Sequence, residues 1–458
     1  MESIISRRIE AGAEGSVEGH RPGFRLVDGS RVAVIGGGPA GSLFSYFALD
    51  LSEMFGIEIK LDLFEPKEFY RPGPAGCNYC GGIISESLVQ MLATEGINLP
   101  ASVVQRGIES YTLHMDIGTV MIGTPAAQKR IAAVHRGAGP AGVQEVKWRS
   151  FDGYLQELAV KRGARLIKER VKEVKWVDGR PRVSVKGESE SYDLLVVATG
   201  INTGTLKMFA ELGLGYRPPR KTKTYICEFH LGEKTIEQAL GNSMHVFLLD
   251  IPRLDFAALI PKGDFVTMCL LGKDIDSTLI SSFLDSAEVK SCFPSGWSST
   301  QKSCYCSPAL AINGAEKPFA DRLVFIGDCG ITRLYKDGIG AAYRTSKAAA
   351  RTAIFSGISA ADFRRHFRPT CRSISFDNQV GKIVFRVTHL IKKMRLSRHG
   401  LLRMVSREQS RAAGTGPMST VLWDTFTGSA PYADVFMRTL NPAFLHRFLW
   451  DTVSAIWS

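Results

Sequence analysis

The sequence predicts an α/β protein with a discontinuous Rossmann-like domain, an inserted mixed-sheet domain and a helical C-terminal tail. Three apolar runs predict the Rossmann-like domain, because each is typical of a buried strand that ends in small residues: 31–35, 192–197 and 322–326. Other runs, alternating or apolar, predict the strands of a second sheet: 110–115, 225–230, 245–249 and 265–270. At 458 residues and 45% hydrophobic content, the chain is long enough for both domains.

The first run leads into a glycine-rich turn, Gly36-Gly37-Gly38-Pro39-Ala40-Gly41, with the spacing G-x-G-x-x-G. The first glycine allows the tight turn, the second lets the backbone approach a pyrophosphate, and the third lets helix and strand pack closely. We expect a helix from Ala40 to about Met54, whose free N–H groups face the phosphates. A second strand over 57–64 ends at Glu65, where a carboxylate can bind ribose hydroxyls. These residues predict a dinucleotide site: Gly36, Gly38, Pro39, Ala40, Gly41 and Glu65.

The two later runs indicate that the dinucleotide is FAD. The run at 192–197 continues into Ala198-Thr199-Gly200, which lets backbone pass close to a cofactor. The run at 322–326 ends in Gly327-Asp328, and a helix rich in alanine follows from 341 to about 355. A carboxylate at a strand end can bind ribityl hydroxyls, and a helix N-terminus can face the pyrimidine edge of a flavin. The predicted FAD residues from these segments are Gly200, Gly327, Asp328, Gly338 and Gly340.

In this order and spacing, the three motifs resemble the FAD-dependent oxidoreductases built like para-hydroxybenzoate hydroxylase. Within them, the geranylgeranyl reductase branch is most similar, on three segments: Cys80-Gly81-Gly82-Ile83-Ile84-Ser85, Arg149-Ser150-Phe151-Asp152 and 256–264. The resemblance spans about 31–355, and it implies FAD as the cofactor. It places Cys80 beside the flavin as a candidate catalytic residue, and Arg149 and the backbone of Val171 at the cofactor.

The chain departs from this family at two places. Its lipid-pocket motif would comprise Phe256, Ala258, Ile260 and Pro261, of which the first three replace the Tyr, Trp and Phe of the branch. Where many relatives have a proline beside the flavin, this chain has Tyr335, followed by Lys336. Both are candidate catalytic residues, since a lysine there would stabilise negative charge on reduced flavin. The alternative for Lys336 is a solvated loop lysine.

The expected organisation alternates between the two domains. The segments are a mobile N-terminal extension (1–30), the first FAD-binding part (31–105), strands of the substrate domain (106–147), the second FAD-binding part (148–204), the main substrate domain (205–319), the third FAD-binding part (320–355) and a helical C-terminal region (356–458).

The resemblance implies an enzyme that reduces C=C bonds of a lipophilic, isoprenoid-like substrate. No second G-x-G-x-x-G unit is present for a bound nicotinamide, so the electron donor is NAD(P)H that docks transiently or an electron-carrier protein such as reduced ferredoxin. The proton donor stays open, with four histidines as candidates: His114, His135, His230 and His245. One alternative is a flavin-dependent hydroxylase or epoxidase on the same fold, and another is a non-catalytic flavoprotein at a membrane surface.

The nine cysteines are scattered, which argues against a secreted disulfide framework. Cys77 and Cys80 have the spacing of a redox dithiol, although the resemblance makes Cys80 a residue of the flavin-side loop. The cysteine spacings match no metal-ligand pattern, so we expect no metal site.

Positive charge is concentrated in one segment. The net charge is +12, and residues 381–411 contribute +8 of it, from nine Lys or Arg and one Glu. Apolar residues recur there at helical spacing, which predicts an amphipathic helix that either lies on an anionic membrane or caps the core. No signal peptide, apolar span or nucleic-acid motif is present, so we expect a protein of the cytosol or the inner membrane face that does not bind nucleic acid.

Overall fold

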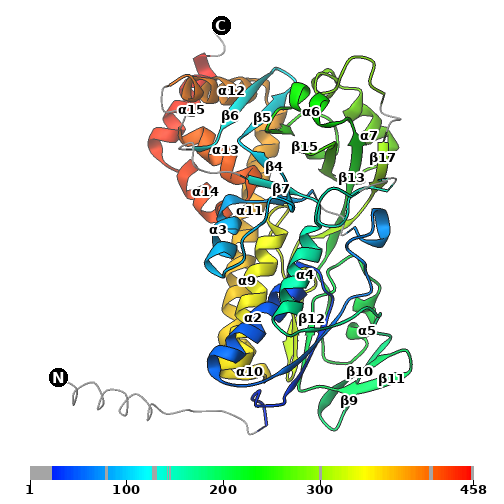
Figure 1. Cartoon of the computed structure of the whole chain (residues 1–458). Helices are drawn as coiled ribbons and strands as arrows, with labels where there is room; N and C mark the ends of the chain where they lie inside the picture. The colour runs from blue at the N-terminus through cyan, green and yellow to red at the C-terminus, as the bar shows by residue number, and fades with distance from the viewer. Residues whose placement is uncertain are drawn as a thin grey trace, which may run out of the picture.

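Figure 1 shows a computed structural model of the chain, which describes residues 23–77, 81–125, 131–141, 143, 146–298, 302–411 and 416–454. Cys80 and residues 1–22 of the predicted extension lie outside this part of the chain. Two sheets lie at opposite ends of the molecule, and long helices run beside the lower sheet toward the upper one (Figure 1).

The lower sheet contains the three predicted Rossmann-like strands. Its order is β19 (Phe319–Ala320), β20 (Leu323–Phe325), β12 (Leu194–Val197), β1 (Arg31–Ile35), β2 (Lys60–Phe64) and β8 (Arg165–Ile167). All neighbours pair in parallel except β19 with β20. Strand β2 begins at Lys60, three residues later than the sequence predicts. The predicted α/β fold class is confirmed.

Alternating residues of β1 separate the two faces of this sheet. Val32 and Val34 belong to the same apolar core as residues of three helices: α2 (Pro39–Phe55), α4 (Phe151–Lys161) and α9 (Gly338–Arg351). Ala33 and Ile35 face the opposite layer. That layer contains α5 (Thr205–Ala210) and a small sheet of β9 (Glu173–Val177), β10 (Arg180–Val185) and β11 (Glu188–Ser191). The strand is thus buried on both sides, as its continuous apolar run predicts.

The upper sheet joins strands from two separate stretches of the chain. In order it has β17 (Lys302–Cys306), β13 (Lys221–His230), β16 (Phe265–Gly272), β15 (Leu254–Lys262), β14 (Ser243–Phe247), β5 (Ser110–Met115) and β6 (Gly118–Gly123), with β18 (Ala309–Ala311) also on β13. Only β14 and β5 pair in parallel. Between the sheets lie α3 (Glu86–Thr94) and a small sheet of β3 (Ile83–Ile84), β7 (Ile131–Val134) and β4 (Val104–Ile108).

Helices cover both faces of the upper sheet. One face packs with α6 (Glu233–Ala239), α7 (Ser277–Leu284) and α8 (Ala287–Lys290). The C-terminal helices α11 (Arg368–Lys393), α12 (Arg395–Gln409), α13 (Pro417–Thr427), α14 (Tyr432–Thr439) and α15 (Pro442–Ser454) lie on the other side (Figure 1). No helix in the described ranges is both long and apolar enough to cross a membrane.

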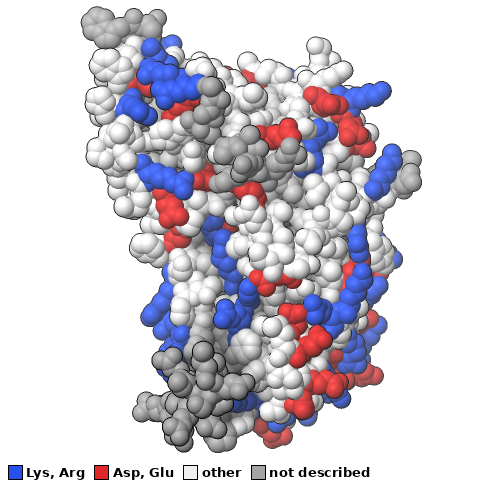
Figure 2. All heavy atoms as spheres, turned by 60° about the vertical axis from the view of Figure 1, so that its left-hand side comes forward, with Lys and Arg blue, Asp and Glu red and all other residues white. Residues whose placement is uncertain are grey.

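The basic segment 381–411 divides between α11 and α12. Leu401, Met404 and Val405 of α12 pack in the same apolar core as the upper sheet, so this helix caps the core. Lys392 and Arg398 are 2% and 5% exposed, and both are engaged inside the protein, Lys392 with the carbonyl of Leu254 and Arg398 with Asp116 at 3.1 Å. Figure 2 shows Lys and Arg side chains gathered at the upper end of one face, with acidic side chains among them.

Candidate functional site

A cavity of about 440 Å³ extends from the lower sheet to the upper one. Fifteen of the residues singled out from the sequence line it: Gly36, Gly38, Pro39, Ala40, Glu65, Val171, Gly200, Phe256, Ala258, Ile260, Gly327, Asp328, Tyr335, Lys336 and Gly338. Four others do not, namely Gly41, Arg149, Pro261 and Gly340. The volume is in the range of small-molecule sites, which lie preferentially between such layers.

The glycine-rich turn has the geometry that its sequence predicts. Gly36 has φ = +105°, and a Cβ atom there would lie 2.5 Å from the carbonyl oxygen of Ala198. At Gly41 a Cβ atom would lie 1.8 Å from the oxygen of Gly36, so this glycine lets α2 approach the turn although it does not line the cavity. Helix α2 begins at Pro39, directly behind the turn. Its N-terminal N–H groups therefore lie at the cavity wall.

Glu65 follows β2 and holds the turn in place. Its carboxylate accepts hydrogen bonds from the backbone N–H of Gly37 and of Lys67, both at 2.8 Å. Burial raises the pKa of Glu65, and these two hydrogen bonds partly oppose that rise. Because a carboxylate has about four acceptor positions, Glu65 can still accept from hydroxyl groups of a ligand in the cavity.

Asp328 is the second carboxylate in the cavity wall. It follows β20 at a turn in which Gly327 has φ = +62°, and a Cβ atom at Gly327 would lie 2.8 Å from Ala40. Burial raises the pKa of Asp328, and the nearby guanidinium of Arg136 opposes this rise. Helix α9 begins at Gly338, so its positive N-terminal end faces the same cavity. At Gly340, a Cβ atom would lie 2.1 Å from Oδ1 of Asp337, so this glycine serves local packing.

Arg149, which the resemblance places at the cofactor, does not line the cavity. Arg136, which the sequence analysis did not single out, lines it instead. Asp152 accepts hydrogen bonds from Nε and Nη2 of Arg136 at 2.9 and 2.7 Å, and so orients the guanidinium. Arg149 instead forms an ion pair with Glu157 and lies 5.1 Å from the ring centroid of Tyr154. Arg136 lies two residues after the end of β7, and nothing in the local sequence relates it to Asp152.

The wall formed by the upper sheet is apolar. Phe256, Ala258 and Ile260 alternate along β15, and all three line the cavity, whereas Pro261 does not. Phe385 of α11 stacks on Phe256, with ring centroids 5.9 Å apart. Phe426 of α13 packs edge to face on Phe256, with ring centroids 5.7 Å apart. The C-terminal helices thus complete the pocket, a contribution that the sequence did not indicate.

Tyr335 and Lys336 lie in the loop before α9, and both line the cavity. Tyr335 has φ = +62° and packs against Phe385, with ring centroids 5.0 Å apart. Nζ of Lys336 donates a hydrogen bond to the carbonyl of Asp424 at 2.7 Å and lies 4.0 Å from the ring centroid of Tyr432. Burial lowers the pKa of Lys336 well below its usual value. The alternative of a solvated lysine therefore does not hold.

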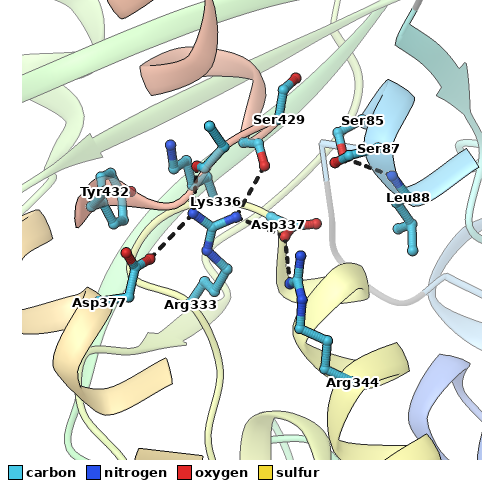
Figure 3. Close-up of polar contacts among 12 residues, drawn as sticks. Ser85, Ser87, Leu88, Arg333, Lys336, Asp337, Arg344, Asp377, Ser429 and Tyr432 are labelled. Carbon is cyan, nitrogen blue, oxygen red and sulfur yellow. Dashed lines mark hydrogen bonds and ion pairs between the residues drawn. The ribbon is translucent and has the colours of Figure 1, made fainter. Parts of the chain in front are cut away.

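The same loop is fixed by ionic contacts (Figure 3). Arg333 contacts Asp337 at 2.9 Å and Asp377 at 3.3 Å, and it donates to the carbonyls of Gly428 and Ala430 at 3.0 and 2.8 Å. Asp337 also forms an ion pair with Arg344 of α9 at 3.0 Å. Arg333 thereby connects the cavity wall to the C-terminal helices.

Comparison with known proteins identifies the fold. No family model and no curated protein matches the sequence. A geranylgeranyl bacteriochlorophyll reductase-like protein from Thermoplasma acidophilum superimposes with a TM-score of 0.63 at 13% identity, over 90% of this chain and 99% of that one. The p-nitrophenol 4-monooxygenase from Pseudomonas putida DLL-E4 superimposes with a TM-score of 0.57 at 10% identity, over 88% of this chain and 99% of that one. Halogenase PltM in complex with phloroglucinol and FAD superimposes with a TM-score of 0.58 at 10% identity, over 92% of this chain and 96% of that one. The chain has the fold of these three proteins, as the resemblance predicts.

Proposed function

We propose that the chain binds FAD in this cavity and reduces C=C bonds of a lipophilic, isoprenoid-like substrate. One observation carries the proposal: a single cavity has a polar wall of dinucleotide-binding character and an apolar wall on the other sheet. The polar wall includes the glycine-rich turn, Glu65 and Asp328, and the apolar wall is centred on Phe256 of β15.

The residues present fit FAD. Gly36 has φ = +105° and passes so close to the carbonyl of Ala198 that a Cβ atom would clash, so it makes the tight turn that the first glycine of a dinucleotide-binding motif provides. Glu65 and Asp328 would accept hydrogen bonds from ribose and ribityl hydroxyls, and the N-terminus of α9 would face the flavin. When bound and reduced, the flavin supplies a hydride.

The chain itself would supply substrate binding, exclusion of water and a proton. The aromatic rings of Phe256, Phe385 and Phe426 form an apolar surface against which a hydrocarbon chain can lie. None of the four candidate histidines lines the cavity, whereas Tyr335 does. Burial raises the pKa of Tyr335, so its hydroxyl keeps its proton at neutral pH. We therefore assign the proton donor to the hydroxyl of Tyr335.

The proposal is tested by anaerobic turnover. FAD-loaded protein is titrated with NADPH, NADH and reduced ferredoxin, and the reduced protein is mixed with a geranylgeranyl lipid and analysed for added hydrogen. Saturation of double bonds without oxygen supports the reductase. A product that carries an oxygen atom from ¹⁸O₂ would instead identify a hydroxylase or epoxidase, and a monooxygenase is among the proteins that superimpose on this chain.

We also propose that the substrate is reached from an anionic membrane surface. Ile383, Val387 and Leu390 are exposed along one side of α11, at the spacing of one helix face, and Met394 is exposed directly after the helix. Arg386, Lys393 and Arg395 are exposed beside them. An apolar stripe flanked by bases has the chemistry of an interfacial helix.

A further inference from the structure

Three buried side chains outside the cavity converge on one point. Nε2 of His114 lies 2.8 Å from Nδ1 of His245, and Sγ of Cys292 lies 3.8 and 3.4 Å from these two nitrogens. The ligand atoms of these three side chains all lie within 4.8 Å of one another. Among the residues that the structure describes, no other group of three or more His, Cys, Asp or Glu side chains does so. We propose that His114, His245 and Cys292 bind one thiophilic metal ion, Cu⁺ or Zn²⁺.

The sheet explains why the two histidines face one another. Strands β5 and β14 are parallel neighbours in which His114 pairs with Phe247, so residues 114, 245 and 247 lie on the same face. Cys292 follows α8 and packs in the apolar core on that face, together with Phe247. Leu113 and Val246, on the opposite face, pack with the cavity residues Ala258 and Ile260. The cluster is thus separated from the proposed flavin site by the sheet and does not depend on it.

The distances suit a metal ion after a small adjustment. With Zn–N and Zn–S bonds of about 2.1 and 2.3 Å, ligand atoms in a tetrahedral site lie about 3.3 to 3.6 Å apart. The two S···N distances of 3.4 and 3.8 Å bracket the expected value, whereas the N···N distance of 2.8 Å is that of a hydrogen bond. An ion would widen this N···N separation by about 0.5 Å.

The outer contacts leave both facing nitrogens able to donate a lone pair. Nε2 of His245 lies 3.3 Å from the carbonyl oxygen of Leu240, to which it donates, so its Nδ1 carries the lone pair. Nδ1 of His114 lies 3.2 Å from the hydroxyl of Thr119, which can donate or accept, so His114 can switch tautomer when an ion binds. Such contacts to the far ring nitrogen are typical of metal-binding histidines.

Charge favours Cu⁺ over Zn²⁺ at this site. Burial lowers the pKa of His114 to about 3 and that of His245 to about 4, so both rings are neutral, and it raises that of Cys292 to about 12. Binding would release the Cys292 thiol proton to solvent, and its sulfur lone pair would form the bond to the metal. Cu⁺ with one thiolate and two imidazoles is neutral, whereas Zn²⁺ leaves one buried positive charge. Trigonal His₂Cys ligand sets are those of copper sites.

The test uses the full chain, stripped of metal and kept reduced. It is titrated anaerobically with Cu⁺ or with Zn²⁺, and bound metal is counted after gel filtration. We expect one ion per chain and a raised Tm in the wild type and in Cys371→Ser, which removes a buried thiol elsewhere. Cys292→Ser should lose both effects. Stoichiometric binding of Cu⁺ alone, or of Zn²⁺ alone, identifies the ion.

A milder variant keeps the proposal testable if Cys292→Ser does not fold. Thr119 is exposed, so Thr119→Val should fold and weaken metal binding by about 10- to 100-fold through His114. The proposal is overturned if the wild type binds neither ion, or if Thr119→Val binds as tightly as the wild type. Flavin content, measured on the same samples, should be unchanged throughout and reports on the proposed function separately.

Discussion

The guanidinium of Arg333 lies 2.9 Å from the carboxylate of Asp337, and both side chains are less than 5% exposed. Asp337 stands at the N-terminus of α9 with φ = +51°, and its carboxylate also contacts Arg344. This ion pair therefore fixes the helix end that faces the cavity. Arg333 also contacts Asp377 of α11 and donates to the carbonyls of Gly428 and Ala430, so it connects the loop to the C-terminal segments that supply Phe385 and Phe426.

Arg333→Met should strongly destabilise the protein, because it leaves Asp337 and Asp377 without their buried partner. Breaking such a pair costs about 3–5 kcal/mol of the free energy of unfolding, which urea denaturation measures. The matched control is Arg217→Met, whose ion pair with Glu316 is exposed and contributes at most about 1 kcal/mol. Equal losses in the two variants would contradict the role of Arg333.

Gly36→Ala should abolish flavin binding. The new methyl group would lie 2.5 Å from the carbonyl oxygen of Ala198, so the turn must move away from the cavity. Gly163→Ala is the control, since Gly163 has φ = +109° and no atom within 4 Å of the Cβ position. Both substitutions add backbone strain of about 1–3 kcal/mol, but only the first adds a clash. The flavin-to-protein absorbance ratio should fall in Gly36→Ala alone.

The glycine-rich turn, Glu65 and Asp328 could be predicted because each depends on local chemistry: a tight turn, or a carboxylate at the end of a buried strand. The contacts of Arg136 with Asp152, and of Phe385 with Phe256, join segments far apart in the sequence, and no local pattern reports such a pairing. The cluster of His114, His245 and Cys292 was missed for the same reason, since strand register brings its members together.

Lys336→Met should change how stability depends on pH. The folded protein releases the proton of Lys336 well below the usual pKa of 10.5, because burial and the charge of Arg333 outweigh Asp337, Asp377 and Asp424. The unfolded chain thus binds more protons in this window, and the free energy of unfolding rises with pH toward 10.5. The free energy of unfolding of the wild type should therefore rise relative to that of Lys336→Met as pH increases from 7 to 10. A constant difference would show that the amine is not desolvated.

Tyr335→Phe should lower turnover of the reduced protein by about 100-fold or more, the contribution of a positioned general acid. Flavin content and the rate of flavin reduction by the donor should stay as in the wild type, because the ring still packs against Phe385. Tyr305→Phe is the control, since Tyr305 is 62% exposed and does not line the cavity. An unchanged turnover would move the proton donor elsewhere.

Changing Arg386, Lys393 and Arg395 together to Glu should prevent sedimentation with anionic vesicles. Each base near such a surface contributes about 1 kcal/mol, so removing three weakens binding by about 100-fold or more. Lys392 and Arg398 are left in place because they are buried. The control replaces three exposed lysines of the other domain, Lys60, Lys172 and Lys207, by Glu. Equal loss in both sets would mean that net charge, and not the α11 surface, drives binding.

The central claim is that three distant segments of this chain hold one FAD. The most direct test is the visible absorbance spectrum of the purified protein after incubation with excess FAD and gel filtration. We predict a yellow protein with one FAD per chain, and a strongly reduced content in Asp328→Ala. A wild-type protein that folds but elutes colourless would contradict the claim.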